Sequence, residues 1–259
     1  MNILINILSA LFCLAIGYLF GSFPTAIVVG KVFFHQDPRD YGSHNAGGSN
    51  AGRLWGKKVG LGIIIFDMIK TIAPLWICWA LFTFVKFKYD GFYHGLCPEM
   101  KFVDKFGLDA TGTFLIPWPV YWLSILGCML GHCFPIFARF KGGKGVSCFM
   151  GCTITSTWMV GFIPGLSYFA FLKAKKYVSL ASIVTSSIIS VFTWIWVILV
   201  MSGVIPPKFY SLPTYGVNLN INFVYATVIT LMTILLIVRH HANITRLKEG
   251  NENKIKWMK

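Results

Sequence analysis

The most constraining feature of this chain is a series of apolar segments that are each long enough to cross a lipid bilayer. A membrane-spanning helix needs about 20 apolar residues to cross about 30 Å of hydrocarbon. We predict full spans at 3–34, 59–85, 117–138, 178–202 and 221–238. Of the 259 residues, 56% are hydrophobic and only 12% are charged, whereas soluble domains carry about twice that charge. The chain is therefore predicted to be an integral membrane protein.

One further apolar stretch, 148–172, is interrupted by GFIPG at 161–165. Glycine and proline disfavour a helix interior, so we predict two short helices that form a hairpin entering and leaving on one side. The predicted fold is all-α: a polytopic helical membrane protein with about seven helical segments, in a single domain over 1–259. The start lacks the basic flank and cleavage site of a signal peptide, and is expected to be a retained first span.

The distribution of lysine and arginine between the loops predicts the orientation. The segments 31–58, 139–147, 173–177 and 239–259 together hold 17 basic and four acidic residues, whereas the other side holds five basic and four acidic residues. Cytoplasmic loops of membrane proteins carry the basic excess. We therefore predict an outside N-terminus, a cytoplasmic C-terminus and an extracytoplasmic loop at 86–116.

The seven cysteines mostly lie inside apolar segments, and no CxxC pair occurs. We predict that they are buried small hydrophobic residues, with neither a metal site nor a disulfide framework. The net charge of +14 indicates anionic partners. The basic residues are dispersed through short loops, so we expect no nucleic-acid partner.

Four segments interrupt the apolar pattern with polar sequence, and all four lie on the predicted cytoplasmic side. They are YGSHNAGGSNAGR at 41–53, GHCFPIFARFKGGKGVS at 131–147, YVSLASI at 177–183 and RHHANITRLKEGNENK at 239–254. They are rich in cations and hydroxyls and almost free of acid, and the chain lacks HEXXH, GxSxG and HxxxxD elements. We predict one site that accepts phosphate groups and needs no metal or cofactor.

FKGGKG, at 140–145, combines glycines with lysines. Glycines beside a lysine let backbone amides approach an anion, and the ammonium adds a point charge. If Gly145 leads into a helix, the helix N-terminus also favours an anion. The sequence is not a Walker A loop, because Ala138 stands at the first glycine position and Gly145 at the final Ser/Thr position. The alternative is a plain turn whose lysines mark the cytoplasmic edge.

The segment 41–53, called here the glycine-rich segment, follows the same logic without lysine. Its glycines give backbone freedom, its serines and asparagines give hydrogen-bonding groups, and Arg53 gives a planar cation suited to phosphate. Polar backbone near a membrane must be satisfied or line a wet cavity. We therefore predict a water-filled, anion-accepting pocket, with a solvated loop beyond the headgroups as the alternative.

His240 and Asn243 lie three residues apart, so both would face one pocket on a continuing helix. Histidine can act as a base near neutral pH, and the alternative is an interfacial histidine in a basic tail. His241 is the rival residue and points about 100° away. Asp67 and Lys70 also lie three apart, within an apolar span. We favour a structural ion pair that braces the glycine-rich segment, with substrate contact as the alternative.

Taken together, these segments closely resemble the bacterial membrane-embedded acyl-phosphate:glycerol-3-phosphate acyltransferases. The family patterns GSxP, D-x-R with its glycine-rich run, and D-x-x-K are matched by GSFP at 21–24, DPRDYGSHNAGGSNAGR, and Asp67 with Lys70. Its GHxxPxxxxFKGGKGV, VSLxSI and RHxxNIxRLxxGxExK are matched by GHCFPIFARFKGGKGV, YVSLASI and RHHANITRLKEGNENK. The matches occur in order. The chain departs from the family at four positions, none of which removes a needed chemical group: His44, Ser49, Thr71 and Ser147.

The resemblance implies transfer of a fatty acyl group from acyl phosphate to the 1-hydroxyl of sn-glycerol 3-phosphate. The products are lysophosphatidic acid and inorganic phosphate, in the first step of phospholipid biosynthesis. No cofactor is needed, nor acyl carrier protein or coenzyme A directly. The resemblance also implies a multi-pass protein of the bacterial cell membrane with its active site on the cytoplasmic side, and we expect a monomer.

An acyl phosphate is an already activated mixed anhydride, so the site has to hold two phosphates together and orient one hydroxyl. The candidate catalytic residues are His240, Lys144, Arg53, Ser43 and Asn243. The candidate substrate-binding residues are Asn45, Asn50, Gly142, Gly143, Gly145, Ser179 and Ser182. Either His240 or a departing phosphate oxygen is the base, and the acyl tail is expected in a groove among helices. Two other functions are considered: an organophosphate transporter, and a non-catalytic lipid-binding or assembly subunit.

Overall fold

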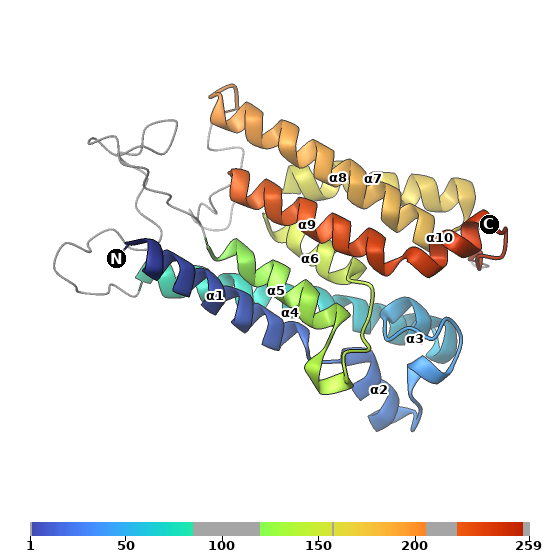
Figure 1. Cartoon of the computed structure of the whole chain (residues 1–259). Coiled ribbons are helices and arrows are strands. Elements are labelled where there is room, and N and C mark those ends of the chain that lie inside the picture. Colours follow the sequence, from blue (N-terminus) through green and yellow to red (C-terminus); the bar gives the residue numbers. More distant parts are fainter. Residues whose placement is uncertain (1, 85–119, 157, 206–221, 256–259) are drawn as a thin grey trace.

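The computed structural model describes residues 2–84, 120–156, 158–205 and 222–255, and the regular secondary structure of this part is helical throughout (Figure 1). The α-helices are α1 (Asn2–Gly21), α2 (Thr25–Phe33), α3 (Gly48–Trp55), α4 (Lys57–Phe84), α5 (Trp122–Cys133), α6 (Val146–Ser156), α7 (Trp158–Lys175), α8 (Val178–Met201), α9 (Phe223–Arg239) and α10 (His241–Lys248). Two 3-10 turns, η1 (Pro38–Asp40) and η2 (Ile136–Ala138), lie in the loops. The predicted all-α class is confirmed. The predicted loop at 86–116, with Cys97, lies outside the described residues.

Several of these helices suit a lipid bilayer. The stretch Ile7–Phe33, the first 25 residues of α4 and the whole of α8 are each long and apolar enough to cross it, and α9 with α10 forms a further candidate, bent by 55°. Shorter apolar helices lie at α5 and α6. The six cysteines in the described part of the chain are all buried, as predicted. The chain is a multi-pass membrane protein, and the count of five full spans stays a prediction.

The first predicted span is interrupted between α1 and α2, at Ser22–Pro24. Proline has no N–H to continue the helical ladder, and the last amide to bond back into α1 is that of Phe23, at 3.3 Å from the carbonyl oxygen of Phe20. On the N-terminal side of this break, α1 packs so closely on α5 that a Cβ atom at Gly17 or Gly21 would overlap the α5 backbone. Small residues let membrane helices approach to this distance.

The hairpin within 148–172 is present, but its predicted break at GFIPG is wrong. α6 ends at Ser156 and α7 begins at Trp158, so Gly161 and Pro164 both lie inside α7. Gly161 is needed for packing, because a Cβ atom there would overlap the backbone of Thr153 on α6. Membrane helices tolerate an internal proline where neighbouring groups satisfy the freed backbone. Sterics between two helices, rather than a turn, explain the glycine.

The four loops that were predicted to share one side do contact one another. The Arg39 guanidinium donates to the carbonyl oxygen of Ala138 at 3.1 Å, and the Arg239 Nε donates to that of Gly143 at 3.2 Å. The backbone N–H of Ile255 donates to the carbonyl oxygen of Lys176 at 2.8 Å. Figure 1 shows α2, α3 and α10 at this end, opposite the start of α1.

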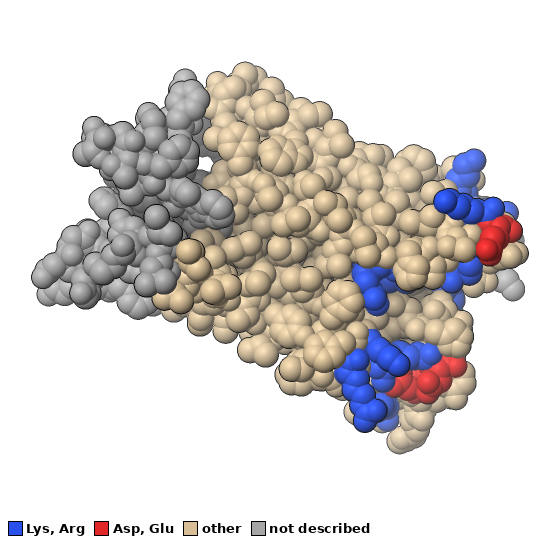
Figure 2. Space-filling view, viewed as in Figure 1, with Lys and Arg blue, Asp and Glu red and all other residues tan. Residues whose placement is uncertain are grey.

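The surface in Figure 2 shows the same division. The lysine, arginine, aspartate and glutamate side chains on the visible face gather at the end that carries α3 and α10, and an uncharged belt follows along the helices. Large apolar side chains of α4 and α8 are exposed, among them Leu61, Val191 and Ile195. An exposed apolar belt of this kind faces lipid hydrocarbon.

Asp67 and Lys70 form a buried ion pair inside α4, with 2.8 Å between Lys70 Nζ and Asp67 Oδ1. The Thr25 hydroxyl also donates to Asp67 Oδ1 at 2.8 Å, and Lys70 Nζ donates to the carbonyl oxygen of Phe23 at 2.9 Å. The ion pair favoured from the sequence is present. It braces the α1–α2 break instead of the glycine-rich segment, so that part of the prediction is wrong.

The variant Lys70→Met tests this pair, because it leaves the Asp67 carboxylate buried without its cation. Breaking one side of a buried pair typically costs about 3–5 kcal/mol, and we expect a loss of that size in the free energy of unfolding measured in detergent micelles. The double variant Asp67→Asn/Lys70→Met removes both charges and should regain most of it. Lys248→Met, on an exposed face of α10, is the control. Equal stability of Lys70→Met and the wild type would contradict a structural pair.

Candidate active site

Lys144 lies in the loop before α6 and reaches across to α10. Its Nζ donates to Asn243 Oδ1 at 2.6 Å. Burial lowers the pKa of Lys144 to about 8, and the positive charges of Arg53 and Arg239 act in the same direction. Lys144 is thus a cation that the protein holds at a site already rich in positive charge, where an anionic ligand would stabilise its charged form.

Glu252, which is not among the candidate residues selected from the sequence, anchors the other side of Asn243. Its Oε1 accepts hydrogen bonds from Asn243 Nδ2 at 2.7 Å and from the Ser179 hydroxyl at 2.8 Å, and its Oε2 accepts one from Arg246 Nε at 2.8 Å. Burial raises the pKa of Glu252, but these hydrogen bonds outweigh it and hold the pKa below its ordinary value. Glu252 therefore stays ionised at neutral pH.

The Glu252 carboxylate corrects the expectation of a site almost free of acid. Glu252 is one of two acidic residues, with Glu249, in the segment RHHANITRLKEGNENK. Its function could not be predicted because its partners Ser179 and Asn243 come from separate segments of the chain. Ser179, expected to contact substrate, instead donates its hydroxyl to this carboxylate.

His240 is buried at the junction of α9 and α10. Its Nδ1 lies 2.8 Å from the carbonyl oxygen of Leu236, and because a carbonyl only accepts, Nδ1 carries the proton and Nε2 presents a lone pair. Burial lowers the pKa of His240 to about 4 although the bond to Leu236 opposes it, so the ring is neutral at pH 7.

The expectation of one continuing helix through His240 and Asn243 is wrong. The chain bends by 55° between α9 and α10, and His240 is the residue at the bend. Both side chains are nevertheless buried at this end of the molecule, whereas His241 is exposed. The predicted choice of His240 over His241 as the inward-facing residue agrees with this burial.

The second half of the glycine-rich segment is the helix α3, which was not expected. A Cβ atom at Gly48 would overlap Ile64 and the backbone of Gly60 on α4, and one at Gly60 would overlap Gly52. These glycines bring α3 against α4, and only Gly42, with φ of +63°, uses the backbone freedom that was predicted. Arg53 is carried at the C-terminal end of α3 and is exposed.

Asn50 has a structural partner for each hydrogen-bonding group. Its Nδ2 donates to the carbonyl oxygens of Pro38 at 2.7 Å and Tyr41 at 3.1 Å, and its Oδ1 accepts from the Ser43 backbone N–H at 2.9 Å. This buried amide holds the loop in place, and the structure does not support its predicted contact with substrate. The side chains of Ser43 and Asn45, by contrast, are half-buried on the same loop and accessible to solvent.

The glycines of FKGGKG have steric functions as well. The amide of Gly143 donates to the carbonyl oxygen of His132 at 3.0 Å, so it is not free for a phosphate as predicted. A Cβ atom at Gly142 would overlap that same carbonyl oxygen, and Gly145 has φ of +81°. This loop folds back on the end of α5 and presents Lys144 from a fixed backbone.

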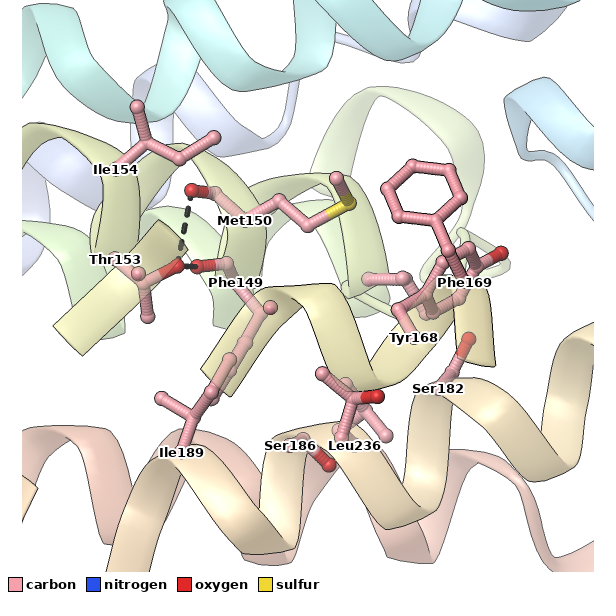
Figure 3. A pocket seen from close by; sticks show the side chains of 14 residues that line it. Phe149, Met150, Thr153, Ile154, Tyr168, Phe169, Ser182, Ser186, Ile189 and Leu236 are labelled. Carbon is pink, nitrogen blue, oxygen red and sulfur yellow. Dashed lines mark hydrogen bonds between the residues drawn. The ribbon is translucent and has the colours of Figure 1, made fainter. Parts of the chain in front are cut away.

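A cavity of about 60 Å³ lies between α6, α7 and α8 (Figure 3). Apolar side chains such as Phe149, Met150 and Ile189 make up most of its lining. Ser182 and Tyr168 lie at one end in the figure. The Ser182 hydroxyl donates to the carbonyl oxygen of Val178 at 2.9 Å, and Ser182 is one helical turn beyond Ser179, which contacts Glu252. The cavity thus adjoins the polar site.

A protein-family model described as "Glycerol-3-phosphate acyltransferase" matches residues 11–250 of the chain. The chain belongs to this family. A glycerol-3-phosphate acyltransferase of Haemophilus influenzae (strain PittGG) is 33% identical over 253 residues, covering 97% of each chain. One from Aster yellows witches'-broom phytoplasma is 32% identical and covers 97% of this chain and 99% of the relative.

Two solved structures of PlsY, described as an integral membrane glycerol 3-phosphate acyltransferase, share the fold. The glycerol 3-phosphate form has a TM-score of 0.69 at 26% identity, covering 96% of each chain. The lysophosphatidic acid form has a TM-score of 0.66 at 25% identity, also over 96% of each chain. This chain is thus an acyltransferase of the same family and fold.

The lowered pKa of Lys144 predicts an alkaline limb in the activity of this acyltransferase. The pH dependence of kcat/KM reports ionisations of the free enzyme, and the ammonium loses its proton as pH rises through about 8. We expect kcat/KM to fall above that pH by up to about tenfold per unit. Lys144→Arg keeps its charge, so its profile should lack this limb. A wild-type profile that stays flat through pH 8 would contradict the assignment.

Proposed function

We propose that this acyltransferase moves a fatty acyl group from acyl phosphate to the 1-hydroxyl of sn-glycerol 3-phosphate, releasing lysophosphatidic acid and inorganic phosphate. It acts as a monomer with one domain over 1–259, in the bacterial cell membrane, with its site on the cytoplasmic side. The observation that supports this most directly is the position of the Lys144 cation, beside the neutral base His240 and next to an apolar cavity.

The cations match a reaction between two phosphorylated substrates. Two phosphates held together repel each other by several kcal/mol at the dielectric of a protein surface. Lys144 and Arg53 are near enough for Arg53 to affect the Lys144 pKa, and they would offset that repulsion from two sides. Glu252 adds one negative charge to this mainly positive site. Its oxygens accept hydrogen bonds from Ser179, Asn243 and Arg246, so we expect the carboxylate not to face the phosphates.

The chemical step is an acyl transfer without a covalent enzyme intermediate. The 1-hydroxyl oxygen forms a bond to the carbonyl carbon, and the bond from that carbon to the phosphate oxygen breaks. The hydroxyl proton goes to Nε2 of His240 or to the departing phosphate. Holding the hydroxyl at the carbonyl contributes about 7–11 kcal/mol to lowering the barrier. We expect the acyl chain to enter beside the small cavity between α6, α7 and α8, whose lining residues Ile154 and Phe169 are exposed.

The experiment that tests this function uses purified protein, acyl phosphate and glycerol 3-phosphate, and measures release of inorganic phosphate. We expect release without an acyl carrier, and at least about 100-fold lower turnover for Lys144→Ala, because removal of one charge-stabilising donor has an effect of that size. Release only on addition of an acyl carrier would contradict the donor. Movement of glycerol 3-phosphate across sealed vesicles without chemistry would support the transporter instead.

The two adjacent histidines provide a matched pair of variants. His240→Ala removes the buried ring with its Nε2 lone pair, and we expect it to lower kcat by about 100-fold or more, since general-base catalysis contributes about 100- to 10,000-fold. His241→Ala changes an exposed ring and should leave kcat within about twofold. Turnover numbers with saturating substrates measure both. The reverse ranking of the two variants would refute the assignment of the base to His240.

A further inference from the structure

His132, at the end of α5, lies between two features that the reaction above does not explain. One is the ion pair of Asp67 and Lys70 inside α4, and the other is the Gly142–Gly143 backbone that precedes Lys144. The ring of His132 is buried, and its Nδ1 lies 3.8 Å from Asp67 Oδ1. A buried charge inside a membrane protein usually has a functional reason.

The other edge of the ring lies against the loop. A Cβ atom built on Gly143 would overlap Nε2, Cε1 and Cδ2 of His132. The carbonyl oxygen of His132 accepts the Gly143 amide at 3.0 Å, and a Cβ atom on Gly142 would overlap that oxygen. Both the ring and the backbone of His132 therefore determine where Gly143 lies.

The ring has little room to move away. Asp67 lies behind it and is itself fixed by Lys70 at 2.8 Å and by the Thr25 hydroxyl at 2.8 Å. Close packing of this kind transmits a displacement instead of absorbing it. A change at the ring is therefore passed to Gly143, and Gly143 is followed directly by Lys144.

We propose that His132 is a positioning residue for Lys144, and that the Asp67–Lys70 pair is the rigid support behind its ring. The proposal rests on the proposed function of Lys144 at the phosphate site. His132 touches no substrate in this account. It fixes the Gly142–Gly143 backbone so that the Lys144 ammonium meets Asn243 and, in the reaction, the phosphate.

The test is a double-mutant cycle between His132→Ala and Gly143→Ala, read as kcat/KM for glycerol 3-phosphate. In the wild-type background, Gly143→Ala forces the loop off the ring, and we expect a loss of at least about 30-fold, within the range of coupling between residues in contact. With the ring removed by His132→Ala, the added methyl group has space. Gly143→Ala should then change kcat/KM by less than about threefold.

Gly142→Ala is the matched control. Its methyl group would meet the backbone oxygen of His132 and the ring of Pro135, neither of which His132→Ala removes. Gly142→Ala should therefore be equally damaging in both backgrounds. Additive effects for Gly143, or coupling of the same size for Gly142, would overturn the proposal. Thermal unfolding midpoints of all variants show whether a loss of activity is a loss of folded protein.

A second measurement separates positioning from packing alone. Release of the loop in His132→Ala should let water reach Lys144 and move the alkaline limb of kcat/KM to higher pH, toward the ordinary lysine value. An unmoved limb in a folded, less active variant would overturn the proposal. If the wild type releases no phosphate at all, the proposed function itself has failed. The cycle is then read from the rise in unfolding temperature on addition of inorganic phosphate, and additive effects on that rise overturn the proposal.

Discussion

The structure of the site depends on one chain of contacts, from Lys144 through Asn243 to Glu252. It joins the loop before α6 to α10, and through Ser179 it reaches the start of α8. These segments are far apart in the sequence. Because the helices between them cross the bilayer, polar contacts outside the hydrocarbon can form only between loops and helix ends. A single carboxylate with three donors holds them together, and a charge-assisted network of this kind is stronger than separate neutral hydrogen bonds.

This arrangement explains how Lys144 can remain protonated although its side chain is partly buried. Burial, together with the nearby arginine charges, lowers the pKa of Lys144 to about 8, so the ammonium keeps its proton at neutral pH with a small margin. A dianionic phosphate then finds a cation that is weakly solvated, and the interaction is stronger than it would be in water. The adjoining cavity is lined mostly by apolar side chains (Figure 3).

The helical membrane class and the grouping of the polar loops at one end could be predicted from the sequence, because both follow from hydropathy and from the placement of basic residues. His240 and Lys144 could be selected because they are polar residues in conspicuous motifs. The reasons for the glycines could not be predicted. Gly48, Gly143 and Gly161 each make room for a neighbour that lies elsewhere in the chain, and a turn or an anion-binding loop has the same local composition.

The other predictions from the sequence that the structure does not support have a related physical origin. Asn50 looked like a substrate ligand, but tertiary contacts with Pro38 and Tyr41 use its amide. Glu252 was not selected from the sequence, yet it is the acceptor at the centre of the network. Pro164 looked like a helix breaker, but helix α7 continues through it. For Asn50 and Glu252, partners that meet only in the folded chain decided the outcome, and the local sequence pattern carried no information about them.

We propose that Lys144 and Arg53 jointly bind phosphate at the end of the molecule that carries α3, the loop before α6 and α10. An experimental structure with glycerol 3-phosphate or inorganic phosphate bound tests it most directly. The account predicts an anion within hydrogen-bonding distance of Lys144 Nζ, with the Arg53 guanidinium on the same anion or on its neighbour. A phosphate bound at the opposite end of the helices, or one that leaves Lys144 untouched, would contradict it.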